Sequence, residues 1–277
     1  MKAQPMVQQR DFEGRVILVC GVARGGIGGA TVRQLAQRGA ILACVDKDQA
    51  TLDASLADIL PHAPQSTGFV ADLTKAVQTK DLVDSVVAHF GRLDGVANIA
   101  GGTRAGEWMA LDEVSDESFE ETCALNLAYA FRISRDAARS MIKRQAPAPI
   151  VNVSSISALN SAPMHGVYGA VKAGLIALTR TMAFEWSKYA IRVNAVSPGA
   201  VPSERVVSKK LRPEDVQCDD APSDILQTTT DEVAQAIIFL LSDQASGISG
   251  HNLVVDSGIS TRNAVLALRM DGRKAGA

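Results

Sequence analysis

"CGVARGGIGGA", residues 20–30, follows directly on the apolar run Val16–Val19 and places five glycines in eleven positions. The glycines do not have the G-x-G-x-x-G spacing of the common dinucleotide fingerprint. The context is nevertheless a strand, a tight turn and then a helix, because the sequence continues as TVRQLAQRGA. Glycines let backbone approach a pyrophosphate, and the free amides of a helix start complement its charge. The stretch therefore predicts a nucleotide-binding turn; the alternative is a turn that only lets helix and sheet pack closely.

Outward from this turn, short apolar runs alternate with segments of helical length. The expected strands are Arg15–Cys20, Ala40–Val45, Gly68–Val70, Gly95–Ile99, Ile150–Val153, Arg192–Val196 and Asn252–Val255. The expected helices are Thr31–Arg38, Ala76–Phe90, Asp116–Arg144, Val167–Lys188 and Asp231–Leu241. Continuous apolar strands separated by helices are typical of a parallel sheet buried on both faces. We expect an α/β fold: a Rossmann-like, doubly wound parallel sheet of about seven strands with helices on both faces.

Three segments fit this alternation poorly, and no linker divides the chain. Residues 1–10 are expected to form a loose arm, and residues 260–277 a tail. Residues 203–230 are polar and contain Pro213 and Pro222, which predicts a long loop or short helices. A segment of this length is more often a lid or substrate-binding loop than an accident; the alternative is plain disorder. We therefore expect residues 1–277 to form one dinucleotide-binding and catalytic domain.

Composition excludes several classes of partner. The net charge is −2, and aromatic residues make up only 4% of the chain, so neither nucleic acid nor an anionic membrane surface is an expected partner. The N-terminus lacks the apolar stretch of a secretory signal, and no window approaches the roughly eighteen apolar residues of a membrane helix. The four cysteines are far apart without metal-ligand spacing. We expect reduced thiols, no bound metal and a cytoplasmic protein.

A carboxylate at the end of the second expected strand bears on the choice of nucleotide. Asp46 lies eighteen residues beyond Gly28. A carboxylate in this place accepts hydrogen bonds from the ribose hydroxyls and repels a 2′-phosphate. Arg24 and Lys47 argue weakly in the other direction, because either could meet a phosphate. The balance favours NAD over NADP; the alternative for Asp46 is an ordinary solvated side chain.

The segment VYGAVKAGLIALTR places Tyr168 and Lys172 four residues apart on one helix face. A free tyrosine has a pKa of about 10, too high for an efficient base near neutrality, and a neighbouring ammonium lowers it. Ser155 lies at the end of an expected strand, where ligands of open α/β sheets bind. Its hydroxyl could hold a substrate oxygen while Tyr168 exchanges a proton; the adjacent Ser154 would point to the other face.

Over roughly residues 12–258 the chain resembles the compact, single-domain short-chain dehydrogenases/reductases. The resemblance is carried, in family order, by GGIGGATVRQLAQRGA, VADLT, VANIAGG, LNLAYAFRIS, IVNVSSIS, YGAVK, IRVNAVSPGAVPS and NLVVDSG. It implies that Tyr168 is the catalytic acid/base, Lys172 its partner and Ser155 the residue that polarises the substrate oxygen. Asn126, in LNL, matches the asparagine that disturbs its helix and holds a water near the lysine. These four are the expected catalytic residues.

The resemblance also implies where the cofactor lies. Asp72 resembles the carboxylate that contacts adenine, Pro198 and Gly199 border the nicotinamide, and Ser203 stands where a threonine often bonds the carboxamide or phosphate. The expected cofactor-binding residues are Gly21, Arg24, Gly26, Ile27, Gly28, Asp46, Asp72, Leu73, Asn98, Ala100, Gly101, Tyr168, Lys172, Pro198, Gly199, Val201 and Ser203. Two departures stand out. Cys20 replaces the family's usual Thr, and one extra residue, Gly25 or a neighbour, lies inside the turn.

These residues predict an NAD(H)-dependent oxidoreductase that interconverts a secondary alcohol and its ketone by hydride transfer. Trp108, Met109, Leu159 and Met164 favour a substrate that is cyclic or largely apolar, although the same residues could simply pack. An NADPH-dependent 3-oxoacyl-type reductase is the alternative enzyme, and a non-catalytic dinucleotide sensor is the alternative of another class. By analogy with the family we expect a homotetramer, or a homodimer, packed through the two long helices.

Overall fold

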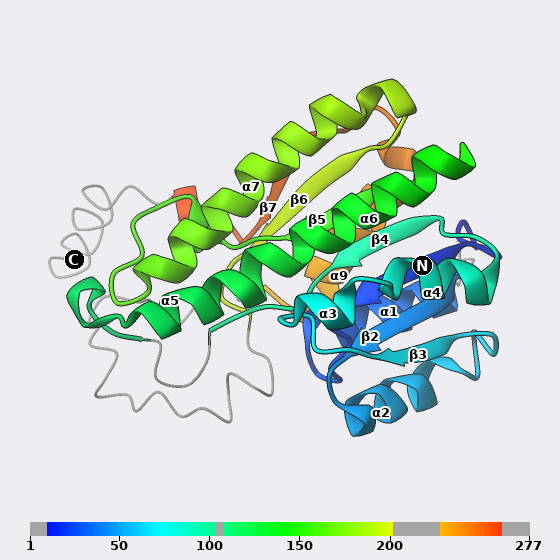
Figure 1. Cartoon of the computed structure of the whole chain (residues 1–277), viewed down its shortest axis with the longest axis horizontal. Coiled ribbons are helices and arrows are strands. Elements are labelled where there is room, and N and C mark those ends of the chain that lie inside the picture. Colours follow the sequence, from blue (N-terminus) through cyan, green and yellow to red (C-terminus); the bar gives the residue numbers. More distant parts are fainter. Residues whose placement is uncertain (1–9, 104–107, 202–227, 262–277) are drawn as a thin grey trace, which may run out of the picture.

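The computed structural model describes residues 10–103, 108–201 and 228–261, and its centre is a seven-stranded sheet (Figure 1). All neighbouring strands are parallel, in the order β3-β2-β1-β4-β5-β6-β7. The strands are β1 (Val16–Cys20), β2 (Ile41–Asp46), β3 (Thr67–Val70), β4 (Gly95–Asn98), β5 (Ile150–Val153), β6 (Val193–Pro198) and β7 (Asn252–Val255). The order reverses direction at β1 and β4, which confirms the predicted doubly wound sheet.

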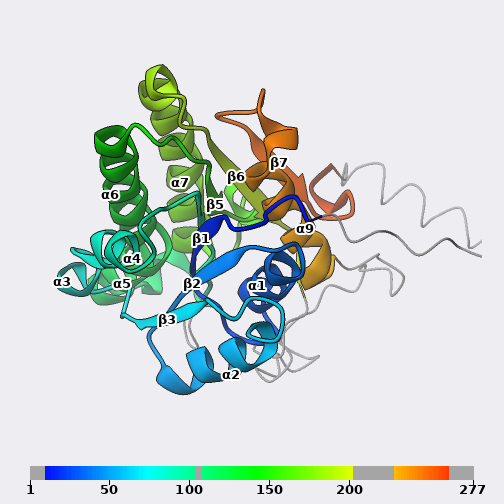
Figure 2. The same ribbon diagram turned by 90° about the vertical axis from the view of Figure 1, so that its right-hand side faces the viewer.

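Helices cover both faces of the sheet (Figure 2). The helices are α1 (Ile27–Gln37), α2 (Gln49–Ile59), α3 (Ala76–Thr79), α4 (Leu82–Phe90), α5 (Asp116–Cys123), α6 (Tyr129–Arg144), α7 (Gly166–Trp186) and α9 (Thr230–Leu241). One face carries α1, α2 and α9, and the other carries α4, α6 and α7. The prediction of helices on both faces is thus confirmed.

The central strands are largely apolar because they supply two hydrophobic cores. In β1, Ile17 and Val19 pack with α1 and α9, whereas Leu18 and Cys20 pack with α4 and α6. All four side chains are fully buried. Since alternate residues of a strand point to opposite faces, a sheet covered on both sides needs this unbroken apolar run.

Several helices differ from the prediction. Helix α1 begins at Ile27, inside the glycine-rich stretch, and α2 was not predicted at all. The helix predicted over Ala76–Phe90 is divided into α3 and α4. At the break the buried Thr79 hydroxyl donates to the Ala76 carbonyl and accepts a bond from Arg132 of α6. Asp81, just before α4, departs from helical backbone angles, with φ −111° and ψ 10°, and this divides the predicted helix.

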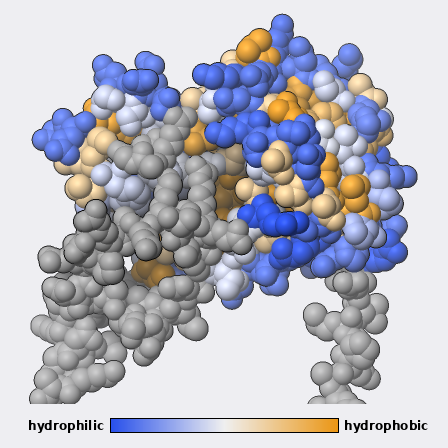
Figure 3. Space-filling model, turned by 90° about the horizontal axis from the view of Figure 1, so that it is seen from below, coloured by the Kyte–Doolittle hydropathy of each residue, from blue (hydrophilic) through white to orange (hydrophobic). Residues whose placement is uncertain are grey.

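Several predictions concern residues outside the described part of the chain. Outside it lie residues 1–9 of the predicted N-terminal arm, residues 203–227 of the predicted substrate loop and residues 262–277 of the predicted C-terminal tail. Within the described residues, no helix combines the length and apolar character needed to cross a bilayer. The face seen from below mixes hydrophilic and hydrophobic residues wherever it is not drawn in grey (Figure 3). Cys20 and Cys44 are free, buried thiols.

Candidate active site

Two glycines at the glycine-rich turn after β1 lie so close to other backbone that neither has room for a side chain. Gly21 has a φ of +87°, and a Cβ there would lie 2.7 Å from the backbone of Ala100. A Cβ at Gly28 would lie 1.8 Å from the carbonyl oxygen of Gly21. Real Cβ atoms do not approach other atoms so closely, so both positions require glycine. The result is a cradle made of backbone.

The start of α1 lies in this cradle and has no capping side chain. Gly26 is the N-cap, no side chain accepts from the first amides, and the first turn has no acidic residue. Some helices are capped: Asp48 accepts from the first turn of α2, and Thr229 forms a capping box with Glu232 in α9. Others, such as α4 and α7, also lack a side-chain cap. Uncapped amides at a helix start attract anions. Together with the glycine cradle, they fit a dinucleotide pyrophosphate.

The lengthened turn is tied to α2. The Arg24 guanidinium donates to both carboxylate oxygens of Asp58, over 2.8 and 2.5 Å, and to the carbonyl of Ala54. The buried Ser55 hydroxyl donates to the carbonyl of Val22 over 2.5 Å. Arg24 is thus engaged with α2 in this structure, and its contact with a cofactor phosphate stays a prediction.

Two predicted carboxylates follow strands on the same side of the sheet. Asp46 ends β2, where it accepts from the backbone amides of Val22 and Lys47 over 3.2 and 2.8 Å. Asp72 follows β3 and accepts from the amide and hydroxyl of Thr74. Partial burial opposes ionisation of Asp72, but these hydrogen bonds outweigh it and lower its pKa. Leu73 beside it is buried, and its carbonyl accepts from Arg132.

Asn98, at the end of β4, belongs to a buried polar network under the site. Its Nδ2 donates to Asn152 of β5 over 2.8 Å and to Ser134 of α6 over 3.0 Å. Asn152 in turn donates to Thr179 of α7. The side chain of Asn98 is only 1% exposed, so it joins the sheet to the helices behind it. A direct contact of Asn98 with a cofactor stays a prediction.

The chain after β4 brings two predicted catalytic residues together. A Cβ on Gly101 would lie 2.8 Å from Asn126 Oδ1 and 3.0 Å from Lys172 Nζ. Just before it, the carbonyl of Ala100 accepts from the hydroxyl of Tyr129 over 2.6 Å. Gly101 therefore lies against both polar groups, and any larger residue would push them apart.

Asn126 interrupts the long helix as expected. It lies in a π-helical turn, Ala124–Ala128, between α5 and α6. Its Oδ1 accepts from the Gly102 amide over 2.9 Å, and its Nδ2 donates to the carbonyls of Gly102 and Thr122. The widened turn is confirmed, and π-turns often occur at functional sites. The water that Asn126 is expected to hold stays a prediction.

Lys172 is almost fully buried, and its ammonium has one hydrogen-bond acceptor in the described structure. Nζ donates to the carbonyl of Val153, the last residue of β5, over 2.9 Å. Nζ also lies 5.6 Å from the ring centroid of Tyr168. Because burial penalises the charged amine, it lowers the pKa of Lys172 to about 7. Ser154 is buried and donates to the backbone carbonyl of Lys172, so it points away from Ser155 as predicted.

The electrostatics of Tyr168 differ from the expectation. Burial raises its pKa to about 12, and a hydrogen bond with Ser155 offsets only part of that rise. The expected lowering by Lys172 is therefore not met in this structure. The physical reason is that the lysine is itself desolvated. With a pKa of about 7, its amine has lost its proton before the phenol of Tyr168 ionises, so it supplies no positive charge to the phenolate. Ser155 Oγ also accepts from the amide of Ser157 over 3.1 Å, which fixes its position.

The end of β6 completes the edge of the site. Pro198 is its last residue, and Gly199 packs so closely on β7 that a Cβ would lie 2.9 Å from Asp256. Val201 packs on the core shared with α1. Ser203 lies outside the described residues.

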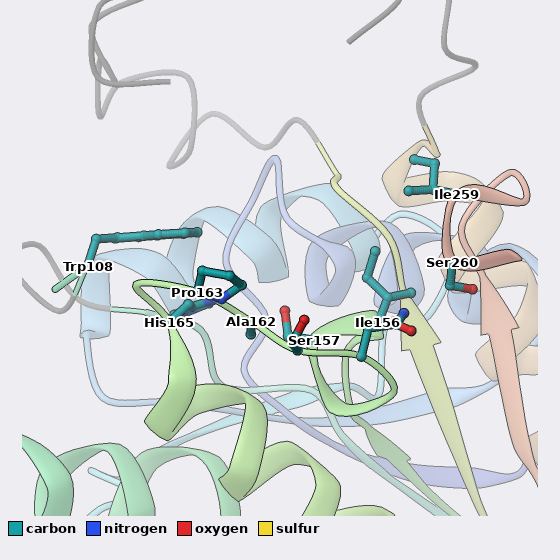
Figure 4. A pocket seen from close by; sticks show the side chains of 10 residues that line it. Trp108, Ile156, Ser157, Ala162, Pro163, His165, Ile259 and Ser260 are labelled. Atoms are coloured by element: carbon teal, nitrogen blue, oxygen red, sulfur yellow. The ribbon is translucent and has the colours of Figure 1, made fainter. Parts of the chain in front are cut away.

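A pocket of about 380 Å³ is lined in part by Ser157 and His165 (Figure 4). Ser157 contacts Ser155, and His165 contacts Tyr168, so the two predicted catalytic residues lie behind this lining. In the close-up, Trp108, Pro163 and His165 form one side, Ile259 and Ser260 the opposite side, and Ile156 and Ser157 lie between them. The described lining contains no acidic side chain, lysine or arginine. Sequence reasoning named Trp108 but missed His165, which is buried and stacks on Tyr168. Its position three residues before Tyr168 was the available signal.

Comparison with known proteins identifies the family. Residues 21–260 match the family model described as Enoyl-(Acyl carrier protein) reductase. The chain belongs to the short-chain dehydrogenase/reductase family. Its members bind a nicotinamide dinucleotide. The chain is an oxidoreductase of this type, with relatives that act on alcohol- or ketone-like substrates.

Similar proteins cover nearly the whole chain. A D-threitol dehydrogenase of Mycolicibacterium smegmatis is 32% identical over 94% of this chain and 99% of its own. The 3-oxoacyl-[acyl-carrier-protein] reductase of Thermotoga maritima is 35% identical over 90% and 98%. Among solved structures, levodione reductase superposes with a TM-score of 0.79 and 30% sequence identity, covering 91% of this chain and 100% of its own. ElxO with NADP bound superposes with a TM-score of 0.80 and 25% identity, covering 90% of this chain and 100% of its own.

Proposed function

We propose that the protein is an NAD(H)-dependent dehydrogenase that interconverts a secondary alcohol, cyclic or largely apolar, and its ketone. The observation that supports the proposal is the clustering of the four expected catalytic residues. Tyr168 forms a hydrogen bond with Ser155, and Lys172 Nζ lies 5.6 Å from the centre of its ring. Lys172 and Asn126 both lie against Gly101. A bound nicotinamide supplies the hydride acceptor or donor. The residues of this chain supply position and proton transfer.

In this proposal Ser155 and Tyr168 act on the same substrate oxygen. The Ser155 hydroxyl donates a hydrogen bond to it, while Tyr168 gives its proton to the oxygen during ketone reduction or accepts the hydroxyl proton during alcohol oxidation. A pKa of about 12 keeps the phenol protonated at neutral pH, ready for the reductive direction. For oxidation, the positive charge of a bound nicotinamide would have to add to that of Lys172 to favour the phenolate. In this proposal Asn126 holds a water between Lys172 and the surface.

Asp46 supports NAD as the cofactor. It is the last residue of β2, and its carboxylate is held in place by the amides of Val22 and Lys47. A 2′-phosphate at this position would meet a fixed negative charge. Arg24, one of the two cations that could compensate, is paired with Asp58. The NADPH-dependent 3-oxoacyl-type reductase remains the second candidate, favoured by the 35% identity to such an enzyme.

A substrate panel tests the proposal. Cyclic and linear secondary alcohols and ketones are supplied with NAD(H) or NADP(H), and turnover is followed by the absorbance of the reduced nicotinamide. We expect turnover of at least one cyclic substrate, with kcat/KM for NADH about tenfold or more above that for NADPH. A clear NADPH preference together with activity on 3-oxoacyl thioesters would favour the second candidate. NADH binding without any turnover would favour a non-catalytic sensor.

We also propose that the protein assembles as a homotetramer, or a homodimer, through the long helices. Three phenylalanines on these helices face solvent: Phe119 of α5, Phe131 of α6 and Phe184 of α7, which are 51%, 39% and 83% exposed. Large apolar side chains exposed on adjoining elements are typical of contact surfaces. Sedimentation of the wild type should give the mass of two or four chains. Phe184→Glu places a charge in the proposed contact surface and should lower the measured mass. A monomeric wild type would contradict the assembly.

A further inference from the structure

Three aromatic rings are stacked at the entrance to the proposed active site. The imidazole of His165 lies against the phenol of Tyr168 with the ring centroids 4.3 Å apart and the planes 7° apart. On its other side lies the indole of Trp108, at 4.2 Å and 18°. His165 immediately precedes α7 and Tyr168 lies in its first turn, whereas Trp108 belongs to the segment that follows β4. The stack thus joins the proposed acid/base to a distant part of the chain.

Two hydrogen bonds hold these segments together. Nε2 of His165 lies 2.6 Å from the hydroxyl of Thr103, and the amide of Met109 donates to the carbonyl of Met164 over 2.9 Å. Met164 has a φ of +59°, a left-handed conformation that non-glycine residues rarely adopt. Such strain persists only where its surroundings fix it, and it is concentrated at functional sites.

His165 is buried and uncharged near neutrality. It is 8% exposed, and burial lowers its pKa to about 4. A neutral imidazole packs flat against a phenol without adding charge beside it. Trp108 differs, because it is 51% exposed and forms a side of the pocket (Figure 4). The inner ring of the stack therefore contacts Tyr168, and the outer ring is open to a ligand.

We propose that His165 is a positioning residue that fixes the ring plane of Tyr168 and holds Trp108 as the wall on which a cyclic substrate packs. The proposal rests on the function proposed above, with Tyr168 as the acid/base. The proposal assigns a different kinetic effect to each of the two residues. Loss of His165 disturbs the geometry of proton transfer and lowers kcat, whereas loss of Trp108 removes a substrate contact and raises KM.

Kinetics of four variants test the separation, with cyclohexanone and 2-hexanone as the probes and NADH as the reductant. His165→Ala should lower kcat for both ketones by about tenfold or more, because small displacements of a reacting group cost at least that much. His165→Phe, which keeps a flat ring, should recover most of the loss. Thr103→Val, which removes one hydrogen bond of the imidazole, should have a smaller effect than His165→Ala. Trp108→Ala should raise KM for cyclohexanone by about tenfold and for 2-hexanone by less.

A second readout does not depend on turnover. The chain has two tryptophans, so Trp186→Phe leaves Trp108 as the single emitter. In that background, His165→Ala should make Trp108 more accessible to acrylamide, and His165→Phe should not. Equal acrylamide quenching in the Trp186→Phe protein and in its His165→Ala and His165→Phe derivatives would overturn the positioning role. An unchanged kcat in His165→Ala would overturn it as well. A wild type that binds NADH and turns over neither ketone nor any other member of the panel would instead refute the proposed function.

Discussion

The β1–α1 turn and the β5–α7 segment border the same edge of the sheet but work with different atoms. In the turn, Gly21 and Gly28 exclude side chains, and what a ligand meets is backbone. In the β5–α7 segment, Tyr168 and Lys172 are desolvated side chains with shifted pKa values. Adding atoms to the turn should therefore weaken cofactor binding. Removing atoms from the side chains of the β5–α7 segment, or changing their charge, should instead lower turnover.

The largest effect should come from removing one oxygen on the β5–α7 side. Tyr168→Phe keeps the ring that stacks on His165 but loses the group that exchanges a proton. We expect kcat/KM to fall about a thousandfold, within the usual range for general acid–base groups, with NADH affinity unchanged. Tyr189→Phe, at a partly exposed tyrosine beyond the end of α7, is the matched control and should retain full activity. Turnover of Tyr168→Phe within a few-fold of wild type would refute the assignment.

The next largest effect should come from adding one carbon to the turn. Gly28→Ala would place a Cβ 1.8 Å from the Gly21 carbonyl, so the cradle must distort. We expect NADH affinity, measured by fluorescence titration, to fall about a hundredfold. Gly174→Ala on α7 is the control, because a Cβ there makes an ordinary 3.6 Å contact with Leu127 and helix propensity favours alanine. Equal NADH affinity in the two variants would show that the cradle does not hold the cofactor.

The buried Lys172 predicts a pH dependence of stability. Its pKa is about 7 in the folded protein against 10.5 for the model amine. Below about pH 7 both states carry the proton, and the cost of burying the charge is constant. Between the two values the unfolded state holds more protons, so the folded state gains stability as pH rises. The free energy of unfolding of the wild type, minus that of Lys172→Met, should rise by roughly 2 kcal/mol from pH 7 to pH 9. A flat difference would mean that the amine keeps its normal pKa.

Much of this arrangement follows from local sequence, because strands covered on both faces are continuously apolar and Tyr168 and Lys172 share one helix face. Helix α2 was missed because its buried side is weak, with Leu52, Ser55 and Ile59, although its cap Asp48 was a readable signal. The raised pKa of Tyr168 could not be predicted in the same way. Desolvation depends on which distant segments cover a side chain, and the stack with Trp108 arises only from tertiary packing.

The smallest expected effect concerns cofactor choice, where the turn side does use a side chain. Asp46→Asn keeps an oxygen that can accept from the Val22 amide but removes the charge that would face a 2′-phosphate. We expect the ratio of kcat/KM for NADPH to that for NADH to rise about tenfold. Asp48→Asn is the matched control: it removes a charge two residues away, and asparagine still caps α2. If both variants shift the ratio equally, general charge rather than the position of Asp46 governs the choice. If neither variant changes the ratio, the Asp46 side chain does not select the cofactor. The turn region then acts through its backbone alone, and cofactor selection depends on other residues.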